Sequence, residues 1–205
     1  MDKSTLDELV NKLGNFTQLK LESIPDIDLY MDQVTTFIEE KLGYLKRNKE
    51  DTAITKTMIN NYTKAGILMP PKKKKYSKQH MILIILTYYL KQILSIGDIQ
   101  NLFSSLVNSI KEGEDHTGDL DKIYEDFLSI EKDEVESFIK DFKCKITKND
   151  NFDYNGEELE KDENSLQFAI EKDKNKLITV VVMLVVRANI EKKMAESIID
   201  NFFKE

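Results

Sequence analysis

The chain has 205 residues, of which 40% are hydrophobic and 33% are charged, and its formal net charge is −7. This composition is typical of a globular protein with one large or two small domains. The chain has only seven glycines and three prolines, which favours a helix-rich fold over sheets with many tight turns. Its single cysteine, Cys144, excludes an intramolecular disulfide or a thiolate zinc site.

No apolar segment typical of a signal peptide follows Met1. The most apolar run, residues 177–186, is well short of the ~20 residues that a transmembrane helix requires. We therefore expect a cytoplasmic protein with no membrane partner.

Positive charge is concentrated in one part of the chain. From Lys46 to Lys91 there are eleven lysines and arginines against two acidic residues, so this segment carries +9 and the remainder carries −16. Such a split indicates one nucleic-acid-binding face on an acidic body.

The first predicted element is a short amphipathic helix within residues 1–23, which packs onto the body or contacts a second copy. A second helix is expected from about residue 29 to residue 42, capped by Asp26 or Asp28 and ended by Gly43. Its apolar residues recur at the i, i+4 spacing of a helix with one buried face.

The next predicted helix covers residues 56–65, with Thr55 as its N-cap and Gly66 just after its end. One face is apolar, and five polar residues are left facing outward: Lys56, Thr57, Asn60, Asn61 and Lys64. Asparagine can pair with the edge of adenine, while lysine and threonine suit phosphates or base edges. The alternative is an ordinary solvated helix face, and the basic turn that follows favours DNA contact.

That basic turn is predicted to be the tip of a small two-stranded wing. Residues 67–69 form a short apolar strand, and Pro70 and Pro71 stiffen the extended segment after it. The tip holds Lys72, Lys73, Lys74 and Lys75, and Tyr76 closes it; all five are predicted to contact DNA. A charge run at a hairpin tip is often only a solvated turn. Four adjacent cations repel one another, however, and DNA phosphates would relieve that repulsion.

The following helix is expected to be the central buried helix of the domain. It starts after the cap Ser77 and runs from residue 78 to about residue 93, apolar nearly all round. Ser95 then caps a helix to about residue 110. The segment KEGEDHTGD (111–119), with its two glycines and alternating charge, is the predicted domain boundary.

Helical spacing returns in the second half at residues 120–128 and 135–142, and in a last helix from about residue 176 to residue 203. By composition the run at 177–186 also suits a buried strand. Apolar residues continue beyond it at spacings of four, which favours a helix. Such a helix suits a domain core or a dimer contact.

The remaining candidates for chemistry have plain structural interpretations. His80 has no second histidine nearby for a metal pair and is interpreted as structural or solvent-facing, and His116 as a linker residue. No base activates Cys144, which is interpreted as a packing residue. The loop 151–156 imitates the start of an EF-hand, but Asp162 stands where the bidentate Glu belongs. We expect an acidic solvated loop there, with no metal and no cofactor.

The segment from Thr55 onward resembles the DNA-binding domain of MerR-type regulators. Tyr62, Gly66-Ile67-Leu68, the four lysines and Tyr76 stand where that family has a helix tyrosine, Gly-Leu-Leu, a basic wing and a wing tyrosine. Residues 94–99 are similar to the start of the family's next helix. One departure is the connection at 43–53, which is longer than the short MerR turn. The resemblance implies a winged helix-turn-helix and a homodimer formed through a helix after the DNA-binding domain.

Two segments, IPDIDLYMDQV (24–34) and TKTMINNYTK (55–64), resemble the domain-of-unknown-function family 1836. That family comes from low-GC Gram-positive bacteria and is regarded as MerR-like. The resemblance covers residues 24–106, about half of the chain.

Together these features predict a mostly α protein. An N-terminal helix (1–23) precedes a MerR-like winged helix-turn-helix domain with a small two-stranded wing (24–110). A C-terminal all-helical domain (119–205) serves dimerisation or signal input. The predicted function is a non-catalytic, DNA-binding transcriptional regulator that grips double-stranded DNA as a homodimer.

Two alternatives stay open at this point. The first is a helical adaptor whose basic tip binds an acidic protein or an anionic surface. The second is an enzyme whose site is assembled from residues distant in sequence.

Overall fold

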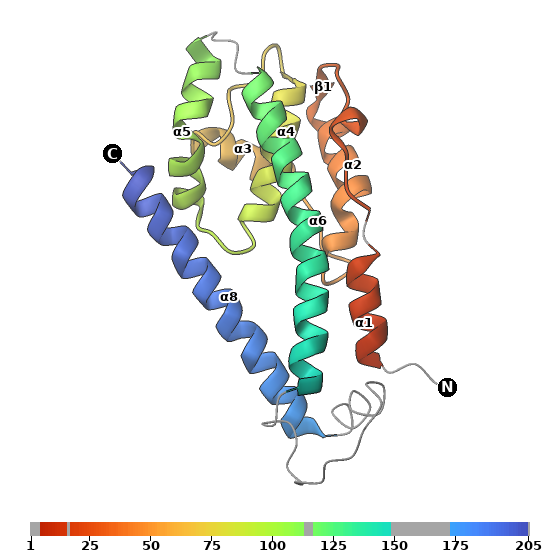
Figure 1. The fold of residues 1–205 in the computed structure, drawn as a ribbon. Helices are drawn as coiled ribbons and strands as arrows, with labels where there is room; N and C mark the ends of the chain where they lie inside the picture. Colours follow the sequence, from red (N-terminus) through yellow and green to blue (C-terminus); the bar gives the residue numbers. More distant parts are fainter. Residues whose placement is uncertain (1–4, 16, 113–116, 149–172, 205) are drawn as a thin grey trace. The chain divides into compact units, whose positions relative to one another are not determined.

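The computed structural model describes residues 5–15, 17–112, 117–148 and 173–204 (Figure 1). These residues are mostly helical, with one small antiparallel sheet, which confirms the predicted mostly α class. The EF-hand-like loop and His116 lie outside the described residues. Within the described parts, no helix combines the length and hydrophobicity needed to span a bilayer.

The chain divides into two compact units. The first is built from Met1–Gln18 and Leu128–Ile190, and the second from Leu19–Phe127 and Glu191–Glu205. Helices α6 (Thr117–Lys148) and α8 (Lys174–Phe202) each contribute to both units. The other elements are α1 (Thr5–Gly14) in the first unit, and β1 (Leu29–Tyr30), α2 (Met31–Leu42), α3 (Lys56–Lys64), β2 (Lys75–Tyr76), α4 (Lys78–Leu90) and α5 (Ile96–Glu112) in the second. Short 3-10 turns cover Leu21–Ser23 and Gly43–Leu45.

Helix α4 is the centre of the second unit. Nine consecutive residues, His80 to Tyr88, are buried, so every face of the helix is covered. This confirms the predicted central buried helix, although it ends at Leu90 rather than near residue 93. Removing each aliphatic side chain from water stabilises the fold by about 1.5–3 kcal/mol, so α4 contributes strongly to the stability of this unit.

The start of α2 differs from the prediction. Neither Asp26 nor Asp28 caps it, because Leu29 and Tyr30 form the strand β1. Tyr30 is the residue before the helix, and its N–H donates to Oε1 of Gln33 at 2.8 Å. The helix ends at Leu42 with Gly43 as its C-cap, as predicted.

The sheet also differs from the predicted wing. The segment 67–69 is not a strand, because the N–H groups of Ile67 and Leu68 bond back to the Tyr62 carbonyl at 3.0 and 3.3 Å. Instead β1 pairs antiparallel with β2, with Leu29 opposite Tyr76 and Tyr30 opposite Lys75. This pairing buries Leu29 and Tyr76, which a solvent-exposed hairpin of 67–76 alone would not do.

The first unit has its own small core. Val10 of α1, Phe142 of α6 and Val180 of α8 are buried together, with Phe138 and Leu184 packed against them. Helix α6 is one continuous helix through the two stretches predicted separately, and α8 is a helix, as predicted. Cys144 is exposed rather than packed in this core, so its interpretation as a packing residue was wrong.

Candidate nucleic-acid interface

Helix α3 presents a polar face to solvent, and its two ends are fixed by local hydrogen bonds. The Thr55 hydroxyl accepts from the Met58 N–H at 3.2 Å, which satisfies one of the free donors of the first turn. Gly66 follows the helix with a positive φ of 77°, a conformation that favours glycine. Ile59 and Tyr62 are buried, and burial raises the pKa of Tyr62.

The five residues predicted to face DNA from this helix are all exposed: Lys56, Thr57, Asn60, Asn61 and Lys64. The sequence periodicity was sufficient here, since a capped amphipathic helix has one possible buried face.

The four lysines form a tight turn. Lys72 bridges Lys75, whose N–H donates to the Lys72 carbonyl at 2.9 Å. Between them Lys73 and Lys74 have φ values of 51° and 65°, both in the left-handed region, as in a type I′ turn. This conformation costs a non-glycine residue roughly 1–2 kcal/mol of conformational energy, so both Lys73 and Lys74 are strained. Lys72, Lys73 and Lys74 are exposed.

The lysine turn and the first turn of α3 meet at the start of α2. Lys75 Nζ lies 5.3 Å from the ring centroid of Tyr30, and the Lys56 ammonium pairs with the carboxylate of Asp32. Tyr30 and Asp32 are exposed and separated by one residue. These contacts bring Lys56 and the four lysines to one surface, which we name the basic edge (Lys56 and residues 72–75).

Tyr76 does not belong to the exposed part of this edge. It is only 3% exposed, and its ring packs edge-on against His80 with the centroids 5.4 Å apart. Burial raises the pKa of Tyr76. Its visible role is therefore to anchor β2 to α4, behind the lysines.

His80 is a buried structural residue, one of the two interpretations that the sequence left open. Its Nδ1 accepts from the Ser77 N–H at 3.1 Å, so Nε2 carries the proton and donates to the Met69 carbonyl at 3.2 Å. Burial lowers the pKa of His80, and its hydrogen bonds to the carbonyls of Met69 and Pro70 partly oppose this. A neutral His80 thus joins the start of α4 to the segment before the lysine turn. The available signal was its place three residues after a serine cap.

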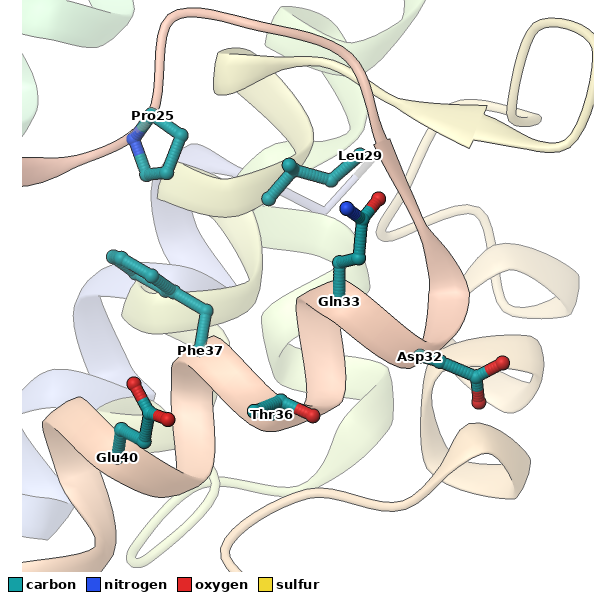
Figure 2. Close-up of a pocket in the computed structure, with 7 residues that line it drawn as sticks. All are labelled: Pro25, Leu29, Asp32, Gln33, Thr36, Phe37 and Glu40. Atoms are coloured by element: carbon teal, nitrogen blue, oxygen red, sulfur yellow. The ribbon is translucent and has the colours of Figure 1, made fainter.

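A mostly apolar groove with two carboxylates beside it lies along α2, next to the basic edge (Figure 2). It has a volume of about 370 Å³. Pro25, Leu29 and Phe37 form its apolar part, and the carboxylates of Asp32 and Glu40 lie along the helix beside it. These carboxylates would repel a phosphate backbone, so a nucleic-acid surface would end near Asp32. In the part of the chain that the structure describes, no cluster of three His, Cys, Asp or Glu residues suits a metal.

The family comparison covers most of this second unit. The model of DUF1836, described as a domain of unknown function, matches residues 19–127, which is more than half of the chain. No curated protein and no solved structure matches the chain. The matched segment contains α2, α3, the lysine turn, α4 and α5. The chain therefore belongs to the DUF1836 family.

Proposed function

We propose that this protein is a DNA-binding transcriptional regulator with a MerR-like winged helix-turn-helix. Helix α3 would enter the major groove, and the lysine turn would contact the adjacent phosphates. One observation carries the proposal: the exposed polar face of α3 adjoins the basic edge, through the contacts of Lys56 and Lys75 with Asp32 and Tyr30. The protein would act in the cytoplasm.

The two parts of this surface suit different tasks. Asn60 and Asn61 are exposed on α3 and can form bidentate hydrogen bonds with adenine. The lysines suit phosphates, where each contact releases a counterion and makes affinity depend on salt. The ion pair of Lys56 with Asp32 is solvent-exposed and therefore worth at most ~1 kcal/mol, so a phosphate can displace it.

The strained lysine turn supports the same assignment. The sequence Asn-Gly adopts a type I′ turn without the backbone strain that the positive φ angles cause in Lys73 and Lys74. Lysines at these two positions lower stability and place two cations at the tip. That arrangement is useful when a polyanion binds there.

The proposal includes a homodimer formed through α8. Within the first unit one face of α8 packs into the core through Val180 and its neighbours. The remaining apolar side chains of this stretch are each more than half exposed: Ile178, Val181, Val182, Val185, Val186 and Ile190. Apolar helix faces of this extent are normally covered in solution. A second copy would cover this face and give the two-fold grip that a two-fold operator requires.

The test is binding of the full chain to a labelled fragment of its own upstream region and to random DNA, titrated against salt. The informative variant is Lys73→Asn with Lys74→Gly, which keeps the turn while removing two charges. We expect weaker binding to both fragments and a salt slope reduced by about 1.8, because each phosphate contact contributes about 0.9. Asn60→Ala with Asn61→Ala should instead lower the preference for the cognate fragment.

The matched control is Lys122→Gln with Lys132→Gln, which removes two exposed lysines of α6 that do not belong to the basic edge. This control should bind DNA as the unaltered protein does. Equal losses in the control and in the turn variant would mean that only overall charge matters. No binding to either fragment at low salt would contradict the proposal and favour the adaptor alternative.

A further inference from the structure

A second pocket lies behind the lysine turn, at the end of the second unit where α4 starts and α5 ends. Its volume is about 430 Å³, within the usual range of roughly 300–1,000 Å³ for small-molecule sites. None of its lining residues belongs to the polar face of α3, so major-groove binding by α3 does not account for it.

The charge of this pocket is positive. Lys72 of the turn, Lys75 of β2 and Lys111 of α5 all line it, while Asp28 is the one carboxylate among its lining residues. His80 also lines it and stays neutral at pH 7, because burial lowers its pKa. The three lysines and the one aspartate that line it have a formal net charge of +2.

The pocket also has an apolar wall, made by Met69, Pro70 and Ile110. Met69 is buried and held in place, since its carbonyl accepts the hydrogen bond from His80. A concave site with an apolar wall and a few converging charges is the usual form of a site for a small charged molecule. The solvated lysines of a plain turn would need no such wall.

We propose that this pocket binds a small dianion with a short apolar body, such as a phosphate monoester or a dicarboxylate. Two negative charges match the net charge of the pocket, and the apolar body packs on the wall of Met69, Pro70 and Ile110. This anion site is inferred from the pocket itself and does not depend on the proposed DNA binding.

A regulatory consequence rests on the proposed DNA-binding function. Lys72 and Lys75 belong both to the pocket and to the basic edge. A dianion held by these two lysines would neutralise their charge and repel DNA phosphates, so the dianion and DNA compete. By linkage the two ligands weaken each other by the same factor.

Lys111 also has a structural role in α5, and the experiment must distinguish this role from contact with a ligand. It lies in the last turn of α5, where a cation is favourable beside the free carbonyl groups. Replacing it therefore lowers helix stability slightly whether or not a ligand binds. Thermal unfolding of each variant distinguishes this effect from loss of a ligand contact.

The experiment is titration calorimetry of the full chain, without DNA, using four probes: phenyl phosphate, phthalate, inorganic phosphate and phenol. The matched variants are Lys111→Gln, which removes a pocket charge, and Lys74→Gln, which removes a turn charge outside the pocket. We expect phenyl phosphate or phthalate to bind at least tenfold more tightly than inorganic phosphate or phenol. Lys111→Gln should weaken that binding at least fivefold, Lys111→Arg should restore it, and Lys74→Gln should change it less than twofold.

The preferred probe identifies the chemical class of the ligand, and the variants test whether the ligand binds at this pocket. Preference for phenyl phosphate assigns a phosphate monoester, and preference for phthalate assigns a dicarboxylate. Equal binding of the best probe to the unaltered protein and to Lys111→Gln would overturn the site, as would inorganic phosphate binding as tightly as the larger dianions. In a separate assay the dianion should release bound DNA. Failure of the protein to bind DNA would refute the proposed function and the competition, while the calorimetry still decides the site.

Discussion

Helix α4 and the first half of α8 are the two most apolar stretches of this protein, and they have different surroundings. In α4 nine consecutive residues are buried. In α8, six apolar residues between Ile178 and Ile190 are more than half exposed, while Val180 on the other side is buried. Both helices are apolar nearly all round, but only α4 is covered on every side by its own unit.

The difference shows what an all-round apolar helix does and does not reveal. It indicates that every face will be covered, because exposed apolar surface is unfavourable by about 25 cal/mol per Å². It does not say which neighbour covers each face. For α4 the neighbours are elements of the same unit, whereas the outer face of α8 is left for the second copy that we propose.

The largest expected effect comes from the same substitution made in each helix. Ile84→Ala in α4 removes a side chain that is 0% exposed, and we expect the free energy of unfolding to fall by about 2–5 kcal/mol. Ile178→Ala in α8 removes one that is 61% exposed, and in a dilute, monomeric sample we expect a change within about 0.5 kcal/mol. Urea unfolding of both variants measures this. Equal costs would show that the outer face of α8 is covered within the monomer.

The next effect tests what covers the outer face. Val182→Glu places a charge where the proposed partner packs. We therefore expect the dissociation constant of the dimer to increase at least tenfold, which corresponds to about 1.4 kcal/mol of association free energy. Ser137→Glu adds the same charge at an exposed polar position of α6, in the same unit but outside this face, and is the matched control. Sedimentation equilibrium over a range of concentrations gives both constants. A protein that is monomeric before any substitution would refute the dimer.

Local signals explain which parts of the structure could be predicted. The caps of α3 and α4 were predictable because Thr55 and Ser77 act within a few residues of themselves. The central position of α4 followed from its composition. The strand pairing was not predictable, because Leu29 and Tyr76 are far apart in sequence and neither lies in a recognisable strand pattern.

In the candidate interface, too, the features set by local sequence were predictable and those set by distant contacts were not. Exposure of the α3 polar face followed from helical periodicity alone. The burial of Tyr76, and the contacts of Lys56 and Lys75 at the start of α2, depend on the β1–β2 pairing. The MerR-type wing resemblance located the lysines correctly at a turn, but it implied a local hairpin where the structure has a pairing with β1.

The two helices also start differently, which gives the smallest predicted effect. Asp173 precedes α8, and its carboxylate accepts from the Asn175 and Lys176 N–H groups. Ser77 is the N-cap of α4, and its N–H donates to the imidazole of His80. An acceptor imidazole loses this capacity when it is protonated, so the start of α4 should be sensitive to mild acid.

Because burial lowers the pKa of His80 below its ordinary value of 6.5, the unfolded chain takes up the proton first as the pH falls. The stabilisation is therefore fully present above pH 6.5 and is lost progressively below it. Nearby Asp28 raises this pKa and Lys72 lowers it, so both stay unchanged in the test.

In the variant His80→Gln, the side-chain amide can still accept the hydrogen bond from the Ser77 N–H, but it does not titrate. Between pH 7 and 5 we expect the unaltered protein to lose about 1 kcal/mol more stability than this variant, the typical worth of a cap, measured by urea unfolding. Equal losses would mean that the link between the imidazole and Ser77 contributes nothing to the start of α4.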